Sequence, residues 1–128
     1  MTGITEKRCP RCKQTKALGD FYRCKGRRDG RQGYCKPCSE ECRRSSFRSR
    51  VYGMSDEEFA ARLEAQAHGC AICLGPLVPG KHLHVDHDHR TGQVRGLLCH
   101  GCNTSLGGFK DDPEVLERAA AYLRHDGF

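Results

Sequence analysis

The chain has 128 residues, of which 37% are hydrophobic and none is tryptophan, so it cannot bury a large apolar core. No apolar run approaches the roughly 18 residues of a membrane span, and the first residues lack the apolar segment of a secretory signal. Ten cysteines are therefore expected to stabilise the fold. Eight of them lie in Cys-x2-Cys pairs, a spacing typical of zinc in a reducing cytoplasm rather than of disulfides.

Charge is distributed unevenly along the sequence. Residues 1–51 contain 15 lysines and arginines against 5 acidic residues, a net charge of +10. Residues 52–128 contain 7 against 11, a net charge of −4. This segregation predicts nucleic-acid binding by the basic part, because a merely solvated surface would not separate the charges in this way. We therefore expect two domains, with residues 1–51 as the DNA-binding module and residues 52–128 as a second domain.

The first domain contains two cysteine pairs that predict a four-cysteine zinc site. The pairs are separated by 22 residues and consist of Cys9, Cys12, Cys35 and Cys38. Between them, residues 21–23 are expected to form a short strand and residues 25–31 a basic, glycine-rich turn. Arg27, Arg28 and Arg31 in this turn are predicted DNA contacts. Cys24 and Cys42 are left over and can either replace a ligand or remain free thiols.

Residues 37–52 have the composition of a basic helix that joins the two domains. Arg44 and Arg48 lie one turn apart, so they share a helix face and are predicted to contact DNA. The alternative is an exposed linker helix that makes no DNA contact.

The second domain opens with a capping box, in which Ser55 is the N-cap and Glu58 the N3 residue of a helix that ends near residues 68–69. Strands are expected at residues 81–86 and 94–99, followed by a short helix from residue 101 or 102 to residues 107–108. A last helix should begin after Asp112, with Pro113 at N1. Its expected buried face consists of Val115, Leu116, Ala119, Ala120 and Leu123.

A second pair of cysteine pairs, 25 residues apart, surrounds these two strands: Cys70, Cys73, Cys99 and Cys102. Four thiolates form a closed tetrahedral shell, so this zinc is expected to be structural and not catalytic. The site would draw together Asp86 and His87 on one side and Asn103 on the other. The sequence thus predicts a small, zinc-stabilised α+β fold in which two strands and a helix form a ββα unit.

The motifs L-x-V-D-H-D-H, from Leu83 to His89, and T-G-x-V-R-G-L-L-C-x-x-C-N, from Thr91 to Asn103, resemble those of the phage recombination endonuclease VII family. That family belongs to the HNH, or ββα-metal, nucleases, and the resemblance covers residues 52–125. It implies an HNH core with flanking helices, preceded here by the extra zinc module, that hydrolyses phosphodiester bonds with one divalent metal ion. It also implies a location in a bacterial or phage-infected cell.

The residues themselves suit this chemistry. Asp86 and Asn103 offer one carboxylate and one carbonyl oxygen to a hard cation, Mg²⁺ or Mn²⁺, and leave positions open for phosphate. His87 is of the residue type that most often serves as a general base near neutral pH. The resemblance assigns these same roles. His89 is expected to contact the phosphate or to compete with His87 as the base, and Arg95 to meet a phosphate or to form a salt bridge.

Two departures from the family pattern limit what the resemblance implies. The chain ends soon after one helix, where the junction-cutting enzymes continue into a long helical extension, and residues 104–107 contain no glutamate. The expected function is accordingly a DNA endonuclease with two structural zinc ions, acting as a nickase, a homing-type or a junction-resolving enzyme. The alternatives are a non-catalytic double-zinc DNA-binding protein and a zinc protein-interaction module. Monomer and homodimer both remain open.

Overall fold

The computed structural model describes residues 3–125, and the chain divides into two compact units, Met1–Gly53 and Met54–Phe128. Each unit combines short antiparallel strands with helices and contains one four-cysteine cluster, so the fold is small α+β as expected. None of the helices in the described part of the chain is both long and apolar enough to cross a membrane.

The first unit is built from two hairpins and a helix. Strand β1 (Glu6–Arg8) pairs with β2 (Thr15–Ala17), and after the 3-10 turn η1 (Leu18–Asp20), β3 (Phe21–Arg23) pairs with β4 (Arg31–Cys35). Helix α1 (Lys36–Tyr52) follows directly and ends at Gly53, which has a left-handed φ of 62° that favours glycine. The predicted strand at residues 21–23 and the basic helix are confirmed.

The core of the first unit is almost entirely the cysteine cluster. Phe21, Cys9 and Cys35 are fully buried, and Cys12 and Cys38 pack against them. With one large apolar side chain at its centre, this unit has little hydrophobic stabilisation of its own. It therefore depends on what the four thiols bind.

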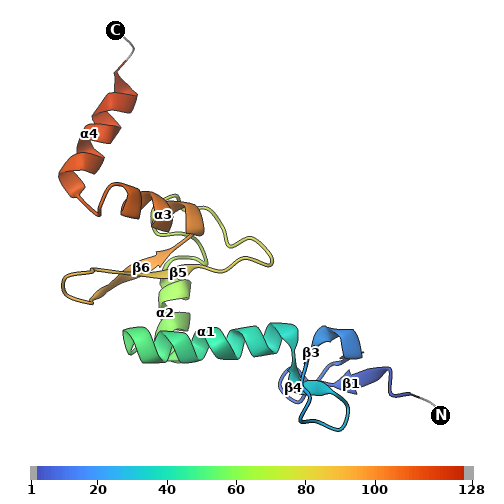
Figure 1. Ribbon diagram of the computed structural model, residues 1–128. Helices are drawn as coiled ribbons and strands as arrows, with labels where there is room; N and C mark the ends of the chain where they lie inside the picture. The colour runs from blue at the N-terminus through green and yellow to red at the C-terminus, as the bar shows by residue number, and fades with distance from the viewer. Residues whose placement is uncertain (1–2, 126–128) are drawn as a thin grey trace. The chain divides into compact units, whose positions relative to one another are not determined.

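The second unit begins with α2 (Asp56–Ala65), whose capping box is confirmed: the Ser55 side chain accepts from the Glu58 backbone and the Glu58 side chain from the Ser55 backbone. Strand β5 (His84–His87) then pairs with β6 (Val94–Leu98) in an antiparallel hairpin. Helix α3 (His100–Gly108) packs against both strands, which completes the predicted ββα unit (Figure 1). Leu83, Val85, Leu97 and Leu98 form the buried apolar part of the hairpin.

Helix α2 ends three residues earlier than the sequence suggested. Ala67 and His68 have left-handed backbone conformations, and Gln66 takes the cap position. The Gln66 amide nitrogen donates to the Gly69 and Leu97 carbonyls at 2.8 and 2.9 Å, and its oxygen accepts from the Leu97 backbone at 2.9 Å. A polar side chain at the end of the helix therefore ties it to β6.

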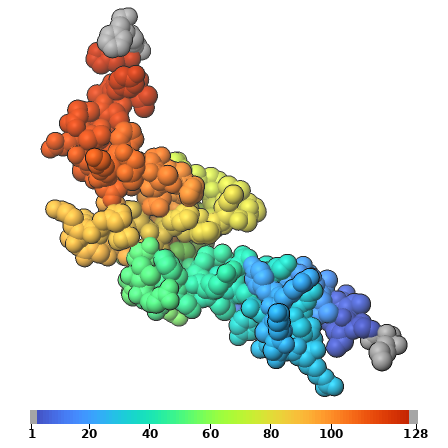
Figure 2. Space-filling view, in the orientation of Figure 1, coloured from blue at the N-terminus to red at the C-terminus, as the bar shows by residue number. Residues whose placement is uncertain are grey.

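Helix α4 (Pro113–Arg124) begins as predicted, with the Asp112 carboxylate accepting from the Glu114 and Val115 backbones. Its expected buried face is only partly correct. Val115, Leu116, Ala119 and Ala120 are half-buried, but Leu123 is 82% exposed and Tyr122 75% exposed. The helix projects beyond the ββα unit in the space-filling view, so its last turn has too little protein beside it to bury Leu123 (Figure 2).

Candidate active site

The structure brings together both predicted sets of four cysteines. In each cluster the sulfur atoms all lie within 4.8 Å of one another, and the Sγ distances Cys12–Cys35 and Cys73–Cys99 are both 3.9 Å. Four sulfurs at about 2.3 Å from a tetrahedral zinc would be about 3.8 Å apart. All ten cysteines are free thiols, including Cys24 and Cys42, which belong to neither cluster. The donor sets therefore fit a thiolate-binding metal.

Backbone N–H groups already point at these sulfurs. Cys35 N lies 3.4 Å from Cys9 Sγ, Ile72 N 3.5 Å from Cys70 Sγ and Cys102 N 3.4 Å from Cys99 Sγ. Burial raises the thiol pKa of Cys9 and Cys70, but the surrounding N–H groups outweigh it and lower both to about 6. Hydrogen bonds with neighbouring thiols raise the pKa of Cys38 and Cys102 to about 12. Each cluster thus favours one deprotonated cysteine. Deprotonation of the further cysteines in the same cluster needs a cation nearby.

The second cluster fixes the parts of the ββα unit. Ala71 N, beside Cys70, donates to Leu97 O in β6 at 3.1 Å, and Cys99 occupies the N-cap position of α3. The knuckle that contains Cys70 and Cys73, strand β6 and helix α3 are consequently joined at one point. Asp86 in β5 and Asn103 in α3, 17 positions apart in the sequence, lie on elements that pack against each other.

The three residues of the predicted catalytic set have different surroundings. Asp86 is buried, whereas His87 and Asn103 are half-buried. The pairing of β5 with β6 shifts register between Asp86 and His87, where Arg95 is the extra, unpaired residue of β6. The Asn103 backbone donates to Cys99 O at 3.0 Å, but its side-chain amide makes no hydrogen bond within the described residues. Its oxygen is therefore open to a ligand.

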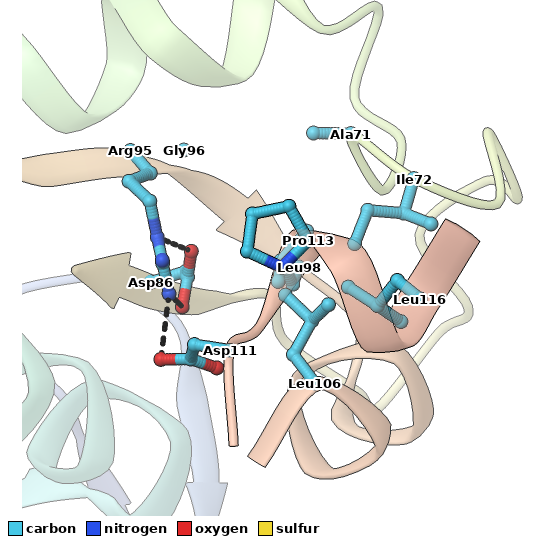
Figure 3. Close-up of a pocket in the computed structure, with 10 residues that line it drawn as sticks. All are labelled: Ala71, Ile72, Asp86, Arg95, Gly96, Leu98, Leu106, Asp111, Pro113 and Leu116. Atoms are coloured by element: carbon cyan, nitrogen blue, oxygen red, sulfur yellow. Dashed lines mark hydrogen bonds and ion pairs between the residues drawn. The ribbon is translucent and has the colours of Figure 1, made fainter. Parts of the chain in front are cut away.

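The Asp86 carboxylate is held by Arg95 from the neighbouring strand. Arg95 Nε lies 2.7 Å from Asp86 Oδ2 and Arg95 Nη2 3.0 Å from Asp86 Oδ1, a bidentate pair. Arg95 Nη2 also lies 3.1 Å from Asp111 Oδ2 (Figure 3). Asp111 Oδ2 in turn lies 3.2 Å from His89 Nδ1. The Arg95 hydrogen bond lowers the pKa of Asp111, and the two carboxylates raise the pKa of Arg95. Of the two roles predicted for Arg95, the structure shows the salt bridge.

A cavity of about 300 Å³ opens beside this network. Its charged lining residues are Asp86, Arg95 and Asp111, and the remaining walls are apolar or backbone: Ala71, Ile72, Gly96, Leu98, Leu106, Pro113 and Leu116 (Figure 3). The cavity therefore places a concave surface next to Asp86.

The remaining histidines of the hairpin region lie in two groups, and Asp88 lies in the turn between the strands. The His87 and His89 rings are 4.6 Å apart, and the His84 ring lies 4.7 Å from His82 and 5.6 Å from His100. Burial and these two neighbours lower the pKa of His84. Asp88 Oδ1 accepts from the Arg90 and Thr91 backbones at 2.7 and 3.1 Å, so it shapes the hairpin turn.

The arginines predicted to contact DNA fall into two groups. Arg27 and Arg28 are exposed on the loop between β3 and β4. Arg31 instead donates to Phe21 O at 3.2 Å, and Arg44 and Arg48 both pair with Glu41 at 3.0 Å. Arg48 is also buried. A DNA role for these three stays a prediction, and their present contacts stabilise the first unit.

Sequence analysis missed two residues that organise the site. Asp111 follows α3 and Gln66 follows α2, and neither belongs to a recognised motif. The missing signal for Asp111 is local: Lys110 and Asp111 both have left-handed φ values, 56° and 54°, and aspartate is one of the few residues that adopts this region readily. A glycine-free turn with aspartate directly before the cap of α4 was the available clue.

The profile of the family described as recombination endonuclease VII matches residues 44–125. The Gene 59 protein of Mycobacterium phage D29 is 46% identical over 84 residues, and that of Mycobacterium phage L5 is 42% identical over 83 residues. Each alignment covers 62% of this chain and 51% of the relative, so the chain spans about half the length of the curated relatives it matches.

Among solved structures, the chain is similar to the ββα-Me type II restriction endonuclease Hpy99I. The two are 29% identical, with a TM-score of 0.41 over 95% of this chain and 66% of the other.

Proposed function

We propose that this chain, which belongs to the recombination endonuclease VII family, is a metal-dependent DNA endonuclease of the HNH type. The observation that carries the proposal is the placement of Asp86 and His87 on β5 and Asn103 on α3, within the matched residues and on elements that pack against each other beside a four-cysteine cluster. A protein that used this fold only as a scaffold would need none of these three side chains.

Asp86 and Asn103 are the residues that would hold the divalent cation. Mg²⁺ and Mn²⁺ accept carboxylate and amide oxygens as ligands. The Asp86 carboxylate faces a cavity, and the Asn103 amide oxygen has no hydrogen-bond partner among residues 3–125. When bound, such an ion supplies charge neutralisation at the phosphate and help for the leaving oxygen. We assign His87 the role of the base that takes a proton from the attacking water, and His89 a place beside it.

Two zinc ions complete the proposed composition. One would be held by Cys9, Cys12, Cys35 and Cys38, and the other by the set from Cys70 to Cys102. Both would be structural, because each shell is closed by four sulfurs.

The test is a cleavage assay with supercoiled plasmid, linear duplex and four-way-junction DNA, with Mg²⁺ or Mn²⁺ added to the zinc-loaded protein or omitted. We expect strand breaks only when the added cation is present, and the ratio among substrates identifies the preferred one. Binding of all three DNAs without any break would instead favour the non-catalytic double-zinc protein.

The DNA-binding surface is proposed to lie on the first unit. Besides the exposed Arg27 and Arg28, Lys36 Nζ and Arg43 Cζ each lie 5.7 Å from the Tyr22 ring centre. The Tyr22 hydroxyl donates to Glu40 at 2.6 Å and so fixes the ring. Cations fixed around an aromatic ring, next to a basic loop, form a surface suited to a phosphate backbone.

The salt dependence of binding tests this surface. Each phosphate neutralised contributes roughly −0.9 to the slope of log affinity against log salt concentration. The Arg27→Ala/Arg28→Ala variant should therefore make the slope shallower by about 2. A matched control, Arg62→Ala/Arg118→Ala, removes the same charge from exposed positions of α2 and α4 and should leave the slope unchanged. Equal slopes for the two variants would assign DNA binding elsewhere. Fluorescence anisotropy at several salt concentrations provides the measurement.

A further inference from the structure

We propose that Arg95 forms an ion pair with Asp86 in the cation-free protein and moves to pair with Asp111 when a divalent cation binds Asp86. Asp111 is then a positioning residue of the nuclease centre, because it holds Arg95 away from the metal ligand. This inference rests on the proposed function, because it takes Asp86 as a metal ligand. It adds Asp111, a residue outside the recognised motif, to the site. It also implies that cation binding must break the ion pair between Arg95 and Asp86.

The first step is that Arg95 uses the atoms that a cation would need. Both Asp86 oxygens accept from Arg95, at 2.7 and 3.0 Å, and the Asp86 side chain is only 10% exposed. A buried carboxylate without a counter-charge is costly, so the pair stabilises the cation-free protein. The same ion pair opposes the binding of a metal cation to the Asp86 oxygens, because Arg95 already occupies them and carries a positive charge.

The second step is that Arg95 has one alternative acceptor within the cavity. Asp111 Oδ2 already lies 3.1 Å from Arg95 Nη2, and the other cavity walls offer apolar side chains. A rotation of the guanidinium toward Asp111 thus exchanges one carboxylate for another without leaving the cation unpaired. Figure 3 shows Arg95 between the two carboxylates.

The third step is that the backbone holds Asp111 in place for this role. Asp111 N donates to Leu106 O at 2.9 Å and Lys110 N to Gly107 O at 3.0 Å, so the turn is tied to the end of α3. The left-handed conformations of both residues direct the Asp111 carboxylate back toward β6. Asp112 then caps α4, which fixes the turn from the other side.

After the transfer, Arg95 would remain next to the metal ligand with a free donor. Its Nη1 group makes no hydrogen bond within the described residues. That group is available to a phosphate oxygen, which is the role that sequence analysis considered for Arg95. The ion pair and the phosphate contact are therefore two positions of one side chain.

Mn²⁺ affinity, measured by calorimetry on the full zinc-loaded chain without DNA, tests the proposal. Mn²⁺ is a suitable probe because thiolate sites prefer zinc to it. A unit charge about 6 Å from a dication, screened as in water, changes affinity about tenfold. Arg95→Gln should bind Mn²⁺ at least about tenfold more tightly, and Asp111→Asn at least about tenfold more weakly. Arg90→Gln removes the same charge from an exposed turn residue and should change affinity less than about threefold.

The double variant separates the transfer from a simple charge effect. If Asp111 acts through Arg95, Asp111→Asn should weaken Mn²⁺ binding much less in the Arg95→Gln background than in the wild type. The same fold-change in both backgrounds would overturn the proposal, as would tighter binding by Asp111→Asn. Should Arg95→Gln fail to fold, Arg95→Lys, which keeps the charge but loses the bidentate geometry, should still bind Mn²⁺ more tightly than the wild type. Absence of Mn²⁺ binding by the folded wild type would overturn the proposed function and this inference together, whereas binding with the wrong order of affinities would overturn the inference alone.

Discussion

Replacement of His87 by alanine is expected to lower the rate of DNA cleavage about 100- to 10,000-fold, the contribution typical of a general base. His87 directly follows the proposed metal ligand Asp86 in β5, and successive side chains of a strand point to opposite faces. One residue can therefore face the cation while the next faces the water. Because His87 is not one of the clustered cysteines, its loss should leave zinc content, thermal stability and DNA affinity close to those of the wild type.

The measurement is single-turnover cleavage at saturating Mg²⁺, with DNA affinity and melting temperature determined for each variant. His68→Ala is the matched control, since His68 is an exposed histidine that pairs with Glu64 at 2.9 Å, outside the hairpin. It should cleave at the wild-type rate. A wild-type rate for His87→Ala combined with a large loss for His89→Ala would move the role of the base to His89. His89 is the alternative base considered because its ring lies 4.6 Å from that of His87.

The elements of the hairpin and its helix could be predicted because their signals are local and chemically specific. Paired cysteines, a capping box and alternating polar and apolar residues each indicate one structure. The clustering of Cys70, Cys73, Cys99 and Cys102 then follows from their spacing, and it brings β6 and α3 together. These sequence features are enough to place Asp86 and Asn103 on neighbouring elements.

The contacts of the charged side chains could not be predicted in the same way. Arg95 lies at the register shift, between the β6 partners of Asp86 and His87, and Asp111 reaches it only because two consecutive residues adopt left-handed conformations. The register shift has no sequence pattern, and the turn at Asp111 is marked only by an aspartate directly before the cap of α4. For the same reason, the shared partner of Arg44 and Arg48, Glu41, was not anticipated, although their common helix face was. Leu123 shows that a sequence pattern can also predict too much burial. The apolar residues of α4 continue at helical spacing to Leu123, but this side chain is exposed.

Loss of one zinc ion is the change expected to have the largest effect on folding. Cys9 and Cys70 are buried at 0% and 1% exposure, one in each cluster. Structural zinc sites contribute an apparent binding free energy of about 10–16 kcal/mol, whereas small domains are stable by only about 5–15 kcal/mol. Cys9→Ser should thus unfold the first unit and Cys70→Ser the second, and each should lower the zinc content from two ions per chain to one.

Because each cluster lies within a single unit, the two losses should be separable. Cys70→Ser should abolish cleavage, since it releases the knuckle that holds β6 and α3 in place. Cys9→Ser should retain the folded β5–β6 hairpin and weak cleavage at low salt. It should lose most DNA affinity, because the basic first unit unfolds. Elemental analysis, amide NMR spectra and the cleavage assay distinguish these outcomes. Cys24→Ser is the matched control: Cys24 is a half-buried thiol outside both clusters, so this variant should keep both zinc ions and full activity. Two zinc ions retained by Cys9→Ser would contradict the assignment of the first cluster, and a wild-type protein without free thiols or metal would show disulfides in place of zinc.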